Sequence, residues 1–145
     1  MLENFLIGFS TMAACLILQA ALVTTALRYY IGHSRRTESD QAWRTLIALV
    51  IIMTLLVLGN VAQLFIWAFV FVYLGEFETL KTAVYHSAVN FATLGYGDFI
   101  MSERYRLLGP LEAINGALMI GVSTAVLIAS LQDALRKAIR AEHLR

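Results

Sequence analysis

The sequence predicts an all-α membrane protein with three transmembrane helices and one shorter helix that enters the membrane without crossing it. Of the 145 residues, 59% are hydrophobic and only 14% are charged, whereas a soluble domain carries about 25% charged residues. Three segments contain no charged residue and reach the roughly 20 residues that span a bilayer, namely 4–27, 45–75 and 113–132. A short apolar segment between the second and the third completes the pattern.

The first segment reads as a retained transmembrane helix and not as a signal peptide. The residues before it, 1–4, are acidic rather than basic, and the apolar run is longer than the 7–15 residues of a signal-peptide core. It contains Cys15, the only cysteine, so a disulfide within one chain is excluded.

Basic residues indicate the orientation of the chain. Eight of the eleven lie in the connection 28–44 and in the C-terminal segment 136–145. The positive-inside rule places both of these in the cytoplasm. The N-terminus and the segment 76–112 then lie outside the cell.

The second segment and the residues after it have unusual lengths. At 1.5 Å per residue, a helix over 45–75 is about 45 Å long, so we expect it to tilt or to project from the bilayer. Residues 79–93 are apolar but too short to cross, with Thr79 as a plausible N-cap. Their less polar positions recur at helical spacing, at Ala83, Val84, Ser87, Ala88 and Phe91. This pattern favours a re-entrant helix followed by extended backbone.

The run that follows carries a family resemblance. It reads Thr93-Leu94-Gly95-Tyr96-Gly97-Asp98 and resembles the selectivity-filter signature of potassium channels, usually Thr-Val-Gly-Tyr-Gly-Asp. The resemblance implies that backbone carbonyls from four subunits replace the water around K⁺. It places K⁺ at Thr93, Leu94, Gly95 and Tyr96, with Gly97 completing the filter. We expect positive φ at both glycines.

The same resemblance assigns supporting residues. Asp98 is expected at the outer mouth of the filter, and Tyr96 is expected to brace it by packing. Some family members have a glutamate where this chain has Val89, so Asp98 needs another partner. Tyr85 and His86 lie where the family often has aromatic residues, and either could donate a hydrogen bond to Asp98.

The resemblance extends over 45–132, with an outer helix, a pore helix over 79–93 and an inner helix. The whole chain looks like small prokaryotic ion channels with an additional N-terminal helix. The resemblance implies three parts: an N-terminal transmembrane helix with a cytoplasmic loop (1–44), a pore domain (45–135) and a basic cytoplasmic tail (136–145).

Two glycines and a glutamate near the third segment each allow more than one interpretation. Gly116 and Gly121 are candidate hinges of the inner helix, or they allow close helix packing. Glu112 suits the start of a helix, but it could also pair with Arg104 or Arg106, or attract cations to an outer vestibule.

Four polar residues lie within the transmembrane segments. Asn60 and Gln63 favour interhelical hydrogen bonds over contacts with ions. Ser123 and Thr124 could line a water-filled cavity or bond back to the preceding helical turn.

Together these observations predict one subunit of a homotetrameric, potassium-selective channel, multi-pass in the cell (inner) membrane. K⁺ is the permeant ion and passes passively, without a cofactor. Membrane lipid is the other expected partner, and no nucleic acid or further small-molecule substrate is expected. The sequence contains neither an enzyme motif nor the arginine series of a voltage sensor. The alternatives are a weakly selective cation channel and a non-conducting helical assembly subunit.

Overall fold

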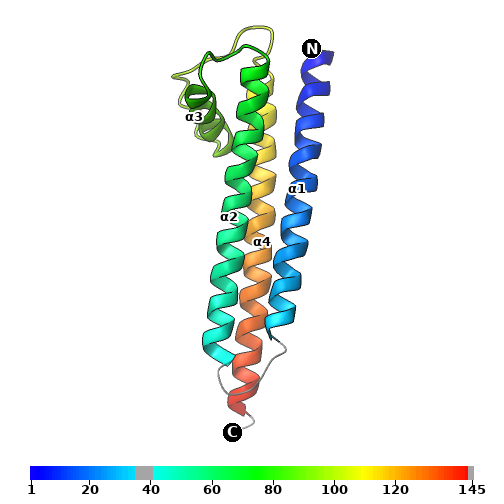
Figure 1. Cartoon of the computed structure of the whole chain (residues 1–145), viewed down its shortest axis with the longest axis vertical. Helices are drawn as coiled ribbons and strands as arrows, with labels where there is room; N and C mark the ends of the chain where they lie inside the picture. Colours follow the sequence, from blue (N-terminus) through cyan, green and yellow to red (C-terminus); the bar gives the residue numbers. More distant parts are fainter. Residues whose placement is uncertain (35–40, 144–145) are drawn as a thin grey trace.

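The computed structural model describes residues 1–34 and 41–143, and in that part of the chain all elements are helices. They are α1 (Leu2–Ser34), α2 (Gln41–Tyr73), α3 (Leu80–Phe91) and α4 (Leu108–His143). The three long helices run side by side, and α3 lies at the end that also holds the N-terminus (Figure 1). The predicted fold class is confirmed, whereas assembly into a tetramer stays a prediction.

All three long helices contain a segment that is long and apolar enough to cross a membrane. These segments are Leu2–Gly32, Thr45–Tyr73 and Leu108–Arg136, with mean hydropathies of 2.1, 2.5 and 1.9. The helices themselves have 33, 33 and 36 residues, so each is about 50 Å long. All three long helices are therefore longer than a bilayer is thick, which we expected only of the second.

The helices also extend beyond the predicted boundaries. The connection expected over 28–44 is shorter, because α1 continues to Ser34 and α2 begins at Gln41. Residues 35–40 of that loop, including two of its arginines, lie outside the described residues, as do 144–145. The segment 136–143 of the predicted tail is helical. Arginine and lysine are good helix formers, so the first charge marks the edge of the apolar segment rather than the end of the helix.

A glycine ends α2. Gly75 has a φ of 75°, and its N–H donates to the Val72 carbonyl at 3.0 Å. The N–H of Glu76 donates to the Phe71 carbonyl at 3.0 Å, which completes a Schellman motif. The helix therefore ends at Tyr73, two residues before the predicted end of the second segment, and the chain turns toward α3 at Gly75.

The predicted N-cap of the short helix is confirmed. Thr79 has extended backbone, with φ −120° and ψ 140°, and its hydroxyl accepts the N–H of Thr82 at 3.2 Å. The last helix, α4, starts at Leu108, five residues before the predicted start of the third segment. Pro110 is tolerated there because the first turn of a helix leaves its N–H groups unbonded anyway.

A polar network crosses the middle of the bundle. The Gln63 amide donates to Gln19 Oε1 at 2.8 Å, the Gln19 amide donates to Ser123 Oγ at 2.9 Å, and the Asn60 amide lies 3.3 Å from the same oxygen. Ser123 also bonds back to the Met119 carbonyl at 2.9 Å. The network joins α1, α2 and α4, so the interhelical role preferred for Asn60 and Gln63 is confirmed.

Candidate functional site

The residues after α3 have an alternating backbone. Thr93, Gly95 and Gly97 have φ values of 58°, 61° and 72°, whereas Leu94 and Tyr96 between them have negative φ. This alternation brings successive carbonyl oxygens to one side of the chain, which an ordinary strand does not do. The positive φ expected at the two glycines is confirmed. The positive φ of Thr93 was not expected, and it costs an L-residue about 1–2 kcal/mol.

Backbone hydrogen bonds attach the start of this segment to α3. The N–H of Thr93 donates to the Asn90 carbonyl at 2.8 Å, and the N–H of Leu94 donates to the Val89 carbonyl at 2.9 Å. Beyond them the side chains project outward, with Leu94 54% and Tyr96 65% exposed. The packing expected to brace Tyr96 is therefore not made within one chain.

The two expected partners of Asp98 lie differently. The Asp98 carboxylate raises the pKa of Tyr85 above its ordinary value, chiefly through a hydrogen bond, and its charge also acts on His86. His86 instead lies with Nε2 2.8 Å from the Asn90 amide nitrogen. Burial lowers the pKa of His86, and a hydrogen bond with the backbone of Phe99 opposes that effect.

An open hollow of about 210 Å³ lies behind the segment, between α3 and the chain that returns to α4. Its polar lining comes from four side chains, His86, Asn90, Asp98 and Arg106. A water molecule occupies about 30 Å³ of liquid volume. The back of the segment is therefore polar and roomy enough for several water molecules.

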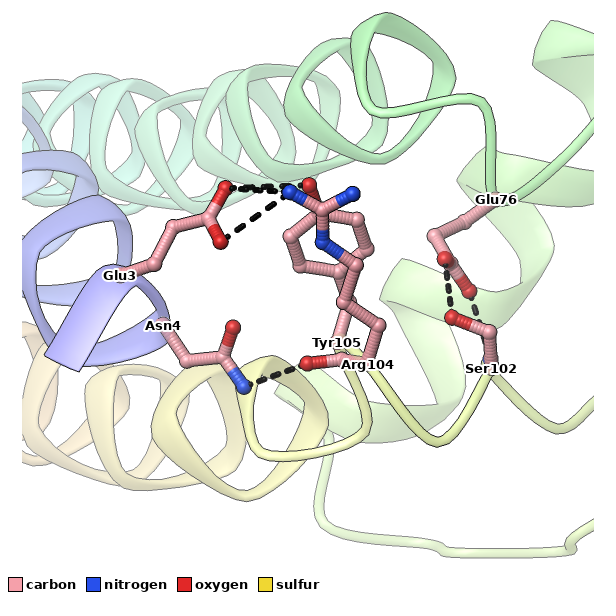
Figure 2. Close-up of polar contacts among 6 residues, drawn as sticks. All are labelled: Glu3, Asn4, Glu76, Ser102, Arg104 and Tyr105. Carbon is pink, nitrogen blue, oxygen red and sulfur yellow. Dashed lines mark hydrogen bonds and ion pairs between the residues drawn. The ribbon is translucent and has the colours of Figure 1, made fainter. Parts of the chain in front are cut away.

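Residues 99–107, the post-filter linker, return the chain to α4. Glu76, just beyond the end of α2, accepts two hydrogen bonds from Ser102, one from the backbone N–H at 2.7 Å and one from the hydroxyl at 2.6 Å (Figure 2). Both carboxylate oxygens are used, so this contact fixes the orientation of the linker backbone at Ser102.

The first turn of α1 contacts the same linker, as Figure 2 shows. The Asn4 amide donates to the Arg104 carbonyl at 2.8 Å. Glu3 accepts from the Arg104 guanidinium at 3.1 Å and from the Tyr105 hydroxyl at 3.2 Å. These contacts were not predicted from the sequence. The only signal was a carboxylate and an amide at the start of an apolar helix, which fits ordinary helix capping equally well.

The position of Glu112 contradicts two of the interpretations offered for it, the pair with an arginine and the outer vestibule. Its side chain is fully buried, and its Oε1 accepts a hydrogen bond from Ser87 on α3. Arg106 pairs with Glu103 at 2.7 Å, and Arg104 pairs with α1. Neither arginine is the partner of Glu112, and a buried carboxylate cannot line an outer vestibule. Glu112, near the start of α4, points toward α3, where it joins the two helices.

The two candidate hinge glycines have different surroundings. A Cβ at Gly116 would overlap the carbonyl oxygen of Phe91 and lie 2.8 Å from its carbonyl carbon, so α4 meets the backbone at the end of α3 there. A Cβ at Gly121 would meet nothing within 4 Å. Close packing against Phe91 explains why residue 116 is a glycine. Helix α4 continues as one helix past both positions. A hinge at either stays a prediction.

The inner-helix hydroxyls bond to the preceding turn. Ser123 is buried against α1 and α2, so it does not line a cavity. Thr124 donates to the Ile120 carbonyl at 2.9 Å and is exposed in one chain. Back-bonding thus describes both residues.

Three long apolar helices, each able to cross a membrane, define a multi-pass membrane protein, with a short helix and irregular backbone at one end of the bundle. A family model described as "Ion channel" matches residues 60–133, just over half of the chain. The chain belongs to this ion-channel family. The match runs from within α2 to within α4 and includes residues 93–98, whereas α1 lies outside it. Comparison with curated proteins and with solved structures gives no match.

Proposed function

We propose that the chain is one subunit of a homotetrameric, potassium-selective channel whose filter is Thr93–Gly97. The observation that carries the proposal is the alternation of φ at Thr93, Gly95 and Gly97. An ion that leaves water needs a ladder of oxygens, and carbonyl groups on one side of the chain supply it. The segment contains no charged side chain, so carbonyl dipoles and the Thr93 hydroxyl select the ion.

Four copies are needed because one segment cannot enclose an ion. The exposed side chains of Leu94 and Tyr96 offer contact surfaces for α3 of neighbouring copies. The C-terminal end of each α3 carries the negative pole of the helix dipole. Four such ends around one axis favour a cation in the middle of the membrane.

In this assembly K⁺ binds to oxygens of Thr93, Leu94, Gly95 and Tyr96, and Asp98 lies at the mouth. K⁺ moves down its electrochemical gradient, so the protein is a channel and not an enzyme, and no cofactor takes part. Lipid surrounds the tetramer in the cell (inner) membrane. Because α1 begins at the end of the bundle that holds α3 (Figure 1), the N-terminus and the filter lie on the same side of the membrane in this proposal. The positive-inside rule puts that side outside the cell and the C-terminus in the cytoplasm.

The test is the reversal potential of the purified protein in liposomes with a potassium gradient. A selective channel gives a value near the potassium equilibrium potential. A value near zero in mixed sodium and potassium supports the weakly selective cation channel instead. Absence of current supports the non-conducting assembly subunit and overturns the proposal.

The orientation has its own test. A Glu103→Cys variant, with Cys15 replaced by serine, places a single thiol in the post-filter linker. An impermeant thiol reagent labels it in intact cells if the linker faces outside. Labelling only after the cells are permeabilised inverts the orientation and leaves the channel proposal untouched.

A further inference from the structure

We infer that the N-terminal end of α1 positions the filter through the post-filter linker, with Asn4 and Glu3 as positioning residues. The inference rests on the proposed function and adds to it a role for the helix that the ion-channel family match does not cover. Neither residue touches an ion. Each acts on the backbone path that leaves the filter.

The post-filter linker transmits displacements because it is short and is attached directly to Asp98. Its nine residues separate Asp98 from the start of α4. Met101 and Tyr105 anchor it in the hydrophobic core, with 7% and 8% of their surface exposed. A displacement of the linker as a unit moves Asp98 and the last carbonyl groups of the filter.

Asn4 makes the stronger of the two contacts. It is only 3% exposed, and its amide bonds to a backbone carbonyl, that of Arg104, at 2.8 Å. A bond to the backbone fixes the chain path itself, whatever the side chain at 104. A buried amide without this partner is strongly unfavourable, so Asn4 holds the linker in one place.

The close approach of α1 to α4 makes this contact possible. A Cβ at Gly8 would overlap Leu111 Cδ1 and lie 3.5 Å from Leu111 Cβ. Gly8 lies one turn beyond Asn4, so the absence of a side chain lets the first turns of α1 reach the linker.

Glu3 adds a contact to the side chains of the linker. It accepts from both Arg104 and Tyr105, and the Arg104 guanidinium lies over the Tyr105 ring at 4.9 Å. The hydrogen bond to Glu3 raises the pKa of Arg104. Both charged groups are more than half exposed, so water screens their attraction. We therefore expect a smaller effect from Glu3 than from Asn4.

The experiment compares full-length variants in liposomes and measures the ratio of potassium to sodium permeability. Asn4→Leu keeps the approximate shape of the side chain and removes its donor. We expect the ratio to fall by about tenfold, the factor that corresponds to 1.4 kcal/mol. The matched control is Glu103→Gln, which removes an ion pair in the same linker that does not involve α1. It should keep the wild-type ratio.

A charge exchange separates positioning from simple destabilisation. Glu3→Arg and Arg104→Glu should each lower the ratio, and the double variant should recover most of it. This pair is exposed, so it remains testable if Asn4→Leu fails to fold. A wild-type ratio in both Asn4→Leu and Glu3→Arg overturns the inference, as does a double variant no better than its parents. A wild-type protein without potassium current overturns the proposed function instead.

Discussion

The filter and the post-filter linker are adjacent in the chain but are stabilised in different ways. The filter has three positive φ values and exposed side chains, and its backbone hydrogen bonds to α3 involve only its first two residues. The linker is hydrogen-bonded to Asn4 of α1 and to Glu76, just beyond the end of α2. Two of its side chains also lie in the hydrophobic core. One chain therefore completes the linker, whereas in the proposed tetramer the filter is completed by the neighbouring copies.

This difference separates two kinds of variant. In the proposed tetramer, a change in the filter alters four copies of a shared ring, so its energy is added four times at one place. A change in the linker alters contacts that each chain makes by itself. The predictions below test that distinction, beginning with the largest expected effect.

Replacing a filter glycine should abolish conduction. Gly97→Ala places a Cβ at a φ of 72°, at about 1–2 kcal/mol per chain and roughly 4–8 kcal/mol for a four-fold ring. Gly75→Ala is the matched control, since its φ is 75° and nothing lies within 4 Å of its Cβ. Potassium flux into liposomes should disappear in the first variant and persist in the second. An equal loss of potassium flux in both variants would contradict the distinction between a site shared by four chains and a site within one chain.

Gly116→Ala should impair the filter indirectly. Its Cβ overlaps the Phe91 carbonyl, and overpacking of this kind costs about 1–3 kcal/mol. The end of α3 must move, and the filter begins two residues later. Gly121→Ala is the control, because its Cβ meets nothing in the chain. We expect a reduced permeability ratio for the first variant alone, measured in the same liposomes. A reduction in Gly121→Ala of equal size would contradict the packing argument.

Glu76→Gln should weaken the linker without abolishing conduction. The variant retains one acceptor and loses a charge-assisted pair of bonds to Ser102, at about 1 kcal/mol. Potassium flux should begin normally and decline faster with time. Glu78→Gln removes an exposed carboxylate nearby and should keep the wild-type time course. A faster decline in both variants would assign the effect to surface charge and not to the bond with Ser102.

His86 predicts a small loss of stability in acid. Its pKa is lowered from 6.5, chiefly by burial, so the unfolded chain takes up the proton first as the pH falls. The stabilisation is complete above about pH 6.5 and is lost below it. Protonation also removes the acceptor that faces the Asn90 amide. The thermal unfolding midpoint in detergent should fall between pH 7 and 5 less in His86→Phe than in wild type. An equal decrease of the unfolding midpoint in both proteins would assign the acid sensitivity to groups other than His86.

Local patterns predicted much of the fold. Runs without charge located the three spans, and a threonine before an apolar run located the start of α3 because capping depends only on nearby residues. The positive φ of Gly95 and Gly97 followed from residue type. Helix ends were less predictable, because charged residues extend a helix as readily as apolar ones.

Contacts between distant residues were not predictable from the same patterns. Asn4 and Arg104 are 100 positions apart, and their meeting depends on how closely α1 approaches α4. Glu112 illustrates the same limit. Its position near the start of a helix was evident, but its direction toward Ser87 depends on the rotation of α4 against α3.

The contact of Gly116 with Phe91 has a thermodynamic consequence. Because α4 touches the backbone at the end of α3, a change in the shape of α4 near Gly116 must displace the residues that begin the filter. Coupling of this kind is reciprocal. If the conformation of α4 alters the affinity of the filter for K⁺, then the occupancy of the filter by K⁺ alters the conformational equilibrium of α4 by the same factor. In the proposed channel the permeant ion is then itself an effector of α4.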